Sequence, residues 1–256
     1  MRTNHVKQKL RAGQPVIGTW LAIGNPHVAE TLAHVGFDWL VVDAEHNPID
    51  IQTLAAMFAV VSPTSTAPMV RVPWGTAENL KRVLDAGAWG VVAPMVNDRA
   101  EAEAVVEACL YPPRGRRSLG GGRHSLSFGT DPLTYFHRAN DELLLIMQIE
   151  SAEGVENVEE IVQVPGVDAV FIGPQDLCAN LGIPPQPEPT DPRFEEAVQR
   201  VLQAAKRHGV APGIHVQTPE TARRRIAEGF QFIAVGSDLR FLTARATELL
   251  GQIARG

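Results

Sequence analysis

Two carboxylates, Glu150 and Asp176, stand at or just after the ends of two successive apolar runs of the sequence. Such a pair can share one divalent cation, and hard oxygen ligands suit Mg²⁺ or Mn²⁺, with water or substrate completing the coordination shell. Gln148 lies two residues before Glu150 and would point to the same side of a strand. The alternative is that Glu150 caps the following helix and Asp176 makes hydrogen bonds within its loop.

An arginine, Arg71, interrupts the apolar run Pro68–Val72. A buried guanidinium is costly unless it meets an anion, and its fork matches a carboxylate through two hydrogen bonds. That anion could belong to a substrate, or Arg71 could form an internal ion pair with an Asp or Glu on the opposite side of the protein interior. A carboxylate site beside a metal site would suit a 2-oxo acid, whose carboxylate and keto oxygens chelate a cation.

His46 is the candidate acid–base residue. It comes three residues after Asp43, which ends the apolar run Trp39–Asp43, and a nearby carboxylate would fix the tautomer of its imidazole. The alternative is a loop histidine bonded to the backbone. His215 lies in another apolar run, Pro212–Val216, and is expected to face the same site as the residues above. The four lysines lie away from all predicted strand ends, which disfavours a Schiff-base mechanism.

Eight short apolar runs alternate with amphipathic segments, and these elements must position the side chains above. Nearly continuous, β-branched runs are typical of strands buried on both faces of a parallel sheet. The predicted strands are Val16–Leu21, Trp39–Asp43, Pro68–Val72, Gly90–Val96, Leu143–Glu150, Ala169–Gly173, Pro212–Val216 and Phe232–Gly236. The predicted helices are 26–35, 50–61, 76–86, 98–109, 153–162, 192–208, 218–228 and 239–254, with N-caps at Asp50, Thr76, Asp98 and Thr218.

Eight strand–helix units in 256 residues predict a (β/α)8 TIM barrel forming one domain over residues 1–256, with a doubly wound open sheet as the alternative. In such a barrel the carboxyl ends of the strands converge on one mouth, where catalysis occurs. Gly173, Pro174 and Gln175 follow the sixth predicted strand, so we expect them to contact the substrate there. The segments 111–130 and 178–191 are predicted to be surface loops that wall the mouth.

The composition excludes several classes of protein. A formal net charge of −6, from 23 Lys+Arg and 29 Asp+Glu, argues against nucleic-acid binding. The sequence has no stretch of about 20 apolar residues that could cross a membrane, and its polar start lacks the apolar core of a signal peptide. Two cysteines cannot build a disulfide framework, so we expect a cytoplasmic protein acting on small molecules.

At these residues the sequence resembles the metal-dependent (class II) 2-oxo-acid aldolases of the HpcH/HpaI family. Five long stretches carry the resemblance in order: FDWLVVDAEHNPID (37–50), RVPWGTAENLKRVLDAGAWGVVAPMV (71–96), YPPRGRRSLG (111–120), IMQIESAEGVENVEEIVQVPGVDAVFIGPQDL (146–177) and AVGSD (234–238). They are spread from residue 37 to residue 238, and the resemblance extends over nearly the whole chain.

The resemblance implies roles for single residues. Glu150 and Asp176 would hold a divalent cation (Mg²⁺, Mn²⁺ or Co²⁺). Arg71 would bind the carboxylate of the 2-oxo acid, which Gln148 would also contact. The match for the general base is His46, with Asp43 as its orienting partner. One departure concerns His215, because relatives often have an aliphatic residue on this strand, on the side of the aldehyde.

The resemblance also implies an activity and an assembly. The activity is reversible cleavage or formation of a 4-hydroxy-2-oxo acid from pyruvate, or hydroxypyruvate, and an aldehyde through a metal-stabilised enolate. Asp85 matches a residue that reaches the mouth of a neighbouring subunit, in a hexamer built as a trimer of dimers that exchange the last helix. The alternative activity is a citrate-lyase-like carbon–carbon lyase acting on a coenzyme A thioester, for which the loop residues Arg114, Arg116, Arg117 and Arg123 would supply positive charge.

Overall fold

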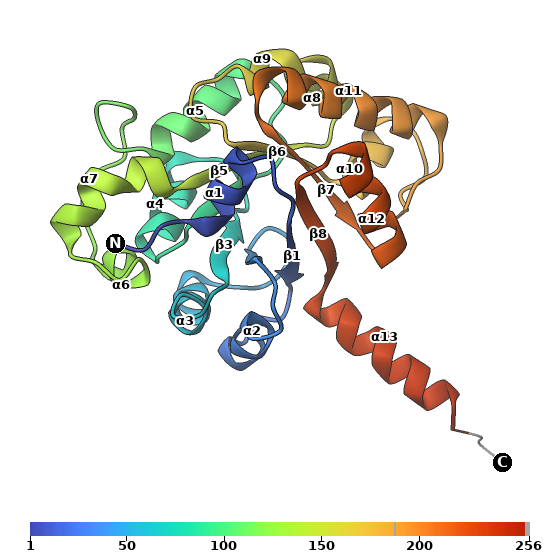
Figure 1. The fold of residues 1–256 in the computed structure, drawn as a ribbon, viewed down its shortest axis with the longest axis horizontal. Helices are drawn as coiled ribbons and strands as arrows, with labels where there is room; N and C mark the ends of the chain where they lie inside the picture. Colours follow the sequence, from blue (N-terminus) through green and yellow to red (C-terminus); the bar gives the residue numbers. More distant parts are fainter. Residues whose placement is uncertain (187, 254–256) are drawn as a thin grey trace.

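In the computed structural model, which describes residues 1–186 and 188–253, eight parallel strands close into a barrel in the order β1 to β8 (Figure 1). This closure confirms the predicted (β/α)8 barrel and excludes the open sheet. The strands are β1 Val16–Leu21, β2 Trp39–Asp43, β3 Ala67–Arg71, β4 Gly90–Ala93, β5 Leu144–Ile149, β6 Ala169–Ile172, β7 Ala211–Val216 and β8 Phe232–Ser237.

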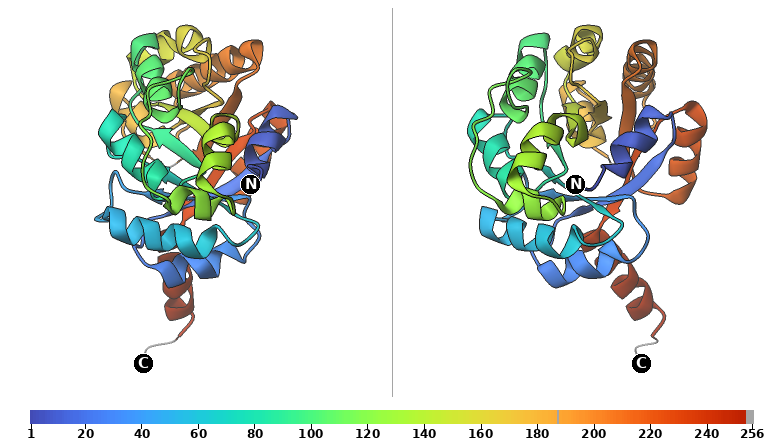
Figure 2. Two further views of the ribbon diagram at one scale, coloured as in Figure 1. Left: turned by 90° about the vertical axis from the view of Figure 1, so that its left-hand side faces the viewer. Right: turned by 60° about the vertical axis from the view of Figure 1, so that its left-hand side comes forward.

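The helices lie around this barrel (Figure 2). Those that follow the strands as predicted are α2 Pro26–Ala33, α3 Ile51–Val61, α4 Ala77–Asp85, α5 Arg99–Cys109, α11 Pro192–His208, α12 Pro219–Glu228 and α13 Asp238–Gly251. All four predicted N-caps are confirmed, because each of these side chains accepts a hydrogen bond from a backbone N–H two or three residues into its helix.

Aromatic rings fill part of the barrel interior. Trp39 stacks on Phe232 with ring centroids 4.2 Å apart, and Phe232 meets Phe171 edge-on at 5.9 Å. Gly18 makes room for this cluster, since a Cβ there would lie 2.1 Å from the Trp39 ring. Burying each aromatic side chain contributes on the order of 2–3 kcal/mol, so this packing fixes the strands that carry the mouth residues.

Several helices were not predicted. Short α1 (His5–Arg11) is capped by Asn4 and buries Val6 and Leu10. The others are α6 (Arg123–Ser127), α7 (Pro132–Glu142) and α10 (Pro174–Asn180). The predicted helix 153–162 is divided into α8 (Ala152–Glu156) and α9 (Val158–Val162), because Asn157 leaves helical geometry at ψ 5°.

Strand β4 ends at Ala93 rather than at the predicted Val96. Met95 adopts a φ of 52°, in the left-handed region that a non-glycine residue rarely occupies, and this stops the extended backbone. In this conformation the Met95 N–H donates a hydrogen bond to the buried Glu150 carboxylate at 3.0 Å. Backbone strain of this kind persists only where surrounding contacts hold it.

The last helix, α13, projects away from the barrel (Figure 1). Asp238 is its buried residue, whereas several large apolar side chains are exposed: Leu239, Phe241, Leu242, Leu249 and Leu250. Exchange of this helix between subunits stays a prediction. Within the described residues, every helix is too short or too polar to cross a membrane.

Candidate active site

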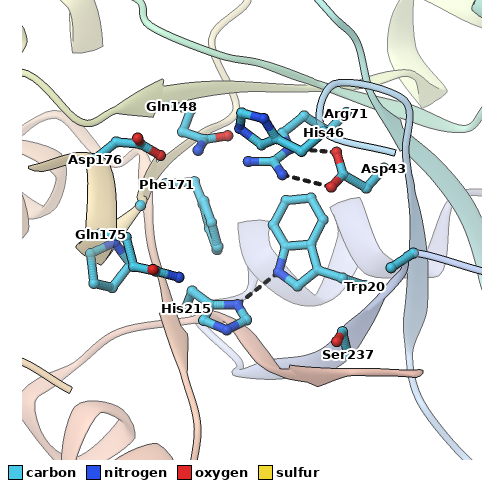
Figure 3. A pocket seen from close by; sticks show the side chains of 13 residues that line it. Trp20, Asp43, His46, Arg71, Gln148, Phe171, Gln175, Asp176, His215 and Ser237 are labelled. Atoms are coloured by element: carbon cyan, nitrogen blue, oxygen red, sulfur yellow. Dashed lines mark hydrogen bonds and ion pairs between the residues drawn. The ribbon is translucent and has the colours of Figure 1, made fainter. Parts of the chain in front are cut away.

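A pocket of about 220 Å³ opens at the carboxyl ends of the strands (Figure 3). The predicted site residues that line it are Asp43, His46, Arg71, Gln148, Gly173, Pro174, Gln175, Asp176 and His215. Trp20, Ala22, Phe171 and Ser237 complete the lining, and the sequence argument missed them. A Trp or Phe inside an apolar strand carries no sequence signal that distinguishes a pocket wall from the core.

Arg71 is held by two carboxylates on one side of this pocket. Its Nε and Nη2 donate to the two oxygens of Asp43 at 2.9 and 2.8 Å, and its Nε lies 3.1 Å from an oxygen of Glu45. The guanidinium also stacks over the Trp20 ring, 4.6 Å from its centroid. Among the described residues Nη1 has no hydrogen-bond partner, so the internal ion pair leaves part of the fork free for a ligand.

Asp43 does not orient His46 in this structure. Its carboxylate accepts hydrogen bonds from Arg71, from Asn47 Nδ2 and from the Glu45 backbone N–H. The acidic group near His46 is instead Glu45, at 3.6 Å from Nε2, and the imidazole is well exposed. The sequence prediction failed because Asp43 is a register partner of Arg71 across β2 and β3, whereas His46 lies beyond the strand.

Glu45 therefore links the arginine and the histidine. Burial raises the pKa of the Glu45 carboxyl, while Arg71 and His46 lower it. In the sequence, only the position of Glu45 directly before His46 suggested that Glu45 belongs to the site. Strand alternation alone did not show that the Glu45 side chain points inward.

Glu150, a predicted site residue, is not among those that line the pocket: it is buried, with 2% of the residue exposed, and contacts the lining residue Gln148. One carboxylate oxygen accepts from the Met95 N–H at 3.0 Å, and the other accepts from Gln148 Nε2. Burial, followed by the negative charge of Asp176, raises the pKa of Glu150 to about 7, against the opposing effect of Met95, Gln148 and Arg71. The hydrogen bonds to Glu150 and the charge of Arg71 therefore do not fully stabilise its deprotonated form.

The surroundings of Glu150 fit a divalent cation. Glycine at position 173 keeps space open, because a Cβ there would lie 2.4 Å from Glu150 Oε2 and 2.9 Å from Gln148 Nε2. The buried Gln148 Oε1 has no partner among the described residues. Two carboxylates and an amide oxygen form a hard donor set. No cluster of three or more His, Cys, Asp or Glu with metal-site geometry occurs in the described chain, so water and substrate would supply the remaining ligands.

The wall opposite Arg71 contains His215 (Figure 3). Its Nδ1 accepts a hydrogen bond from Trp20 Nε1 at 2.8 Å, and its Nε2 lies 2.7 Å from the Gln217 amide. Burial, with the charges of Arg71 and Arg240, lowers the pKa of His215 to about 4. The ring is therefore neutral near pH 7.

Asp85 lies outside this pocket, at the end of α4. Arg117 donates to it at 2.7 Å, and the Arg117 guanidinium lies 4.6 Å from the centroid of Tyr111. A quarter of the Asp85 side chain is exposed. Its role in a neighbouring subunit stays a prediction.

The whole chain is similar to proteins of a known family. Residues 16–244 match the family model described as HpcH/HpaI aldolase/citrate lyase. The chain is 38% identical to the 4-hydroxy-2-oxo-heptane-1,7-dioate aldolase of Shigella sonnei over 247 residues, which cover 96% of this chain and 93% of the relative.

Solved structures agree with this. The fold superimposes on an HpcH/HpaI aldolase/citrate lyase family protein from Burkholderia cenocepacia with a TM-score of 0.91 and 36% identity, covering 98% of this chain and 99% of the other. The citrate lyase beta subunit of M. tuberculosis is more distant, with a TM-score of 0.61 and 17% identity over 91% of this chain and 95% of that one, so it shares the fold alone.

Proposed function

The chain belongs to the HpcH/HpaI aldolase/citrate lyase family and is a class II aldolase, and on this premise we propose that it reversibly cleaves a 4-hydroxy-2-oxo acid into an aldehyde and pyruvate or hydroxypyruvate. The observation that carries the proposal is that Arg71, Gln148 and Asp176 line one pocket, while Glu150 is buried beside it and accepts a hydrogen bond from Gln148. An arginine fork beside a hard-cation site matches the carboxylate and keto oxygens of a 2-oxo acid.

Glu150 and Asp176 would hold the divalent cation, which we take to be Mg²⁺, Mn²⁺ or Co²⁺. When bound, such a cation polarises the keto group and stabilises negative charge on its oxygen. The carboxylates contribute the charge that holds it, and the Met95 N–H keeps Glu150 turned toward the site. Gly173 leaves the space that the ligand oxygens need.

Arg71 would bind the substrate carboxylate through the part of its fork that the described residues leave free. Asp43 and Glu45 fix the guanidinium before the substrate arrives, so little side-chain entropy is lost on binding. Trp20 covers one face of the guanidinium and keeps water from it. The 2-oxo acid is thereby held in a single orientation.

His46 would act as the acid–base group. In cleavage it accepts the proton of the 4-hydroxyl group, directly or through a water molecule, the C3–C4 bond breaks, and the bonding electrons remain on the pyruvate fragment. The aldehyde leaves, and C3 of the resulting enolate is then protonated. Glu45, rather than Asp43, is the carboxylate placed to stabilise the protonated imidazole.

The test is an aldol assay with pyruvate and an aldehyde, with and without Mn²⁺, on the wild type and the Glu150→Ala and Asp176→Asn variants. We expect Mn²⁺-dependent product from the wild type and a loss of roughly 100-fold or more in either variant. Activity that survives a chelator, or that persists in both variants, would refute the assignment.

The alternative activity on a coenzyme A thioester has less support from the four loop arginines that suggested it. Arg114 pairs with Asp141, Arg116 with Glu107, and buried Arg117 with Asp85, so three of the four charges are paired within the chain. Among the described residues Arg123 has no ion-pair partner. We therefore favour the aldolase.

We also propose that α13 packs against a second copy of the chain, as expected for a hexamer built from dimers. Its exposed leucines and phenylalanine give it an apolar face that the described barrel leaves uncovered. A molar mass from light scattering tests this. A cytoplasmic location is proposed because both cysteines are buried free thiols.

A further inference from the structure

The turn that follows β4 places a backbone N–H against the candidate metal ligand. Met95 has a φ of 52°, and in this left-handed conformation its N–H donates to Glu150 Oε1 at 3.0 Å. The next N–H, that of Val96, donates to the carbonyl oxygen of Gln148 at 3.1 Å. Two successive N–H groups of this turn therefore bind the end of β5, and one of them does so through the Glu150 side chain.

Methionine has no intrinsic preference for the conformation that Met95 adopts. At positive φ its Cβ crowds the backbone, and its side chain has no polar group that could hydrogen-bond locally, as asparagine does. Without support, Met95 would relax to a negative φ, which rotates its N–H relative to the chain that follows. Contacts from other residues must therefore hold the turn.

Asn97 provides such a contact. Its Nδ2 donates to the Met95 carbonyl oxygen at 2.9 Å, and its Oδ1 accepts from Ser151 Oγ at 2.5 Å. The direction of the amide is fixed, because a backbone carbonyl oxygen can only accept a hydrogen bond and so must face the NH₂ group. Ser151 directly follows Glu150. The Asn97 side chain thus joins the two segments that form the Met95–Glu150 hydrogen bond.

The backbone of Asn97 is anchored as well, which makes the side chain a fixed support. Its N–H donates to Glu101 Oε2 at 2.7 Å, and its carbonyl oxygen accepts from Asn157 Nδ2 at 2.9 Å. Ser151 Oγ accepts from the Gly154 N–H at 2.9 Å, so the hydroxyl hydrogen is left for Asn97. All four polar groups of Asn97 are bonded within the chain, and the residue is not among those that line the pocket.

We propose that Asn97 is a positioning residue for metal binding, which holds Met95 in the left-handed turn and so directs the Met95 N–H at Glu150. This inference rests on the proposed function, in which Glu150 is a ligand of the cation. Asn97 itself touches neither the cation nor the substrate in this role. With Oε1 of Glu150 held by Met95, Oε2 faces the space beside Gly173 before the cation arrives.

The experiment measures Kd for Mn²⁺ by calorimetry, without substrate, in a double-mutant cycle of Asn97→Ala and Met95→Gly. Asn97→Ala should raise Kd roughly tenfold or more, as is usual when a group that orients a metal ligand is lost. Met95→Gly should stay within about threefold of the wild type, because glycine adopts a positive φ without steric cost. In the Met95→Gly background, Asn97→Ala should change Kd by less than about twofold.

A matched control and a second variant accompany this cycle. Asn79→Ala is the control, because Asn79 Nδ2 likewise donates to a loop carbonyl oxygen, that of Trp74 at 3.1 Å, in the turn after β3. Its Kd should equal that of the wild type. Ser151→Ala removes the hydrogen bond that orients the Asn97 amide, and the same cycle with Met95→Gly applies to it. Circular dichroism of each metal-free variant establishes that it is folded, and Ser151→Ala carries the test if Asn97→Ala does not fold.

The outcomes separate this inference from the proposed function. An unchanged Kd in Asn97→Ala, or an equal loss of affinity in both backgrounds, overturns the role of Asn97 alone, provided that Glu150→Ala weakens Mn²⁺ binding. A wild type that binds no Mn²⁺, or that binds it equally well after Glu150→Ala, refutes the metal site of the proposed function and this inference with it. A loss in Asn97→Ala that disappears in the Met95→Gly background supports both.

Discussion

Asp43 and Arg71 are register partners on adjacent strands, and the carboxylate binds the guanidinium through two parallel hydrogen bonds of 2.9 and 2.8 Å. This bidentate pair, rather than a pairing with His46, is the main contact of Asp43. The substrate-binding arginine is consequently oriented by the barrel itself. Substituting Arg71 and Asp43 in turn tests this arrangement.

Arg71→Lys should raise KM for pyruvate by roughly 10- to 100-fold, because a lysine cannot reproduce the fork that meets both Asp43 and a substrate carboxylate. Steady-state kinetics with pyruvate as the varied substrate provides the measurement. Arg114→Lys is the control, since Arg114 lies on the surface and pairs with Asp141. An unchanged KM in Arg71→Lys would show that the carboxylate binds elsewhere.

Asp43→Asn should raise KM for pyruvate by about 3- to 10-fold through the loosened Arg71. We expect the shape of the kcat–pH profile to stay as in the wild type, because Asp43 does not contact His46. A shifted limb in that profile would mean that Asp43 does set the histidine, contrary to the structure.

Metal affinity should depend on pH through Glu150. Its pKa is raised to about 7, mainly by burial and then by Asp176, and the cation requires the deprotonated carboxylate. We expect Kd for Mn²⁺, measured by calorimetry, to level off above about pH 8 and to rise by roughly tenfold per pH unit below 7. A flat profile between these limits contradicts the assigned ligand.

The metal-free protein should lose stability as pH rises from about 5 to 7.5. The folded state keeps the Glu150 proton up to about pH 7, whereas the unfolded chain releases it near 4.5, so the folded state binds more protons in this window. The contribution is on the order of 2–3 kcal/mol. Urea unfolding of the wild type and of Glu150→Gln checks it, since the variant should lack this part of the pH dependence.

Gly173→Ala should abolish metal-dependent activity while the barrel remains folded. The added Cβ would lie 2.4 Å from Glu150 Oε2 and must displace that carboxylate. Gly120→Ala is the matched control, because nothing lies within 4 Å of the added atom there. Activity assays and circular dichroism on both variants decide the point, and an active Gly173→Ala enzyme would count against this geometry.

The sequence was informative wherever local pattern determines structure. Buried parallel strands read as apolar runs, so the polar residues at their ends identified most of the pocket lining, and the four N-caps were likewise visible. Contacts between strands were not visible. The Trp20–His215 hydrogen bond joins β1 to β7, which are separated by β8 in the barrel, and no local spacing encodes that.

Two further misses have local causes. α6 lies within 111–130, which was predicted to be a loop because of its glycines and prolines. α7 follows that segment and was not predicted, although Asp131 followed by Pro132 was a readable helix start. The partner of Asp43 was misjudged because order along the chain gives proximity but not side-chain direction. Glu45 was overlooked as a site residue for the same reason.

The ion pairs of Arg71 have a consequence for how the cation and the 2-oxo acid affect each other's binding. Four carboxyl groups lie at or beside the pocket, those of Asp43, Glu45, Glu150 and Asp176, and they outnumber the guanidinium of Arg71. Above about pH 7, where Glu150 is deprotonated, an incoming organic anion therefore meets net repulsion. A bound inorganic cation would cancel that repulsion. The bound anion would in turn raise the affinity of the site for the cation. Occupancy of the two subsites is therefore thermodynamically linked, and each ligand titrated in the presence of the other should bind more tightly than alone.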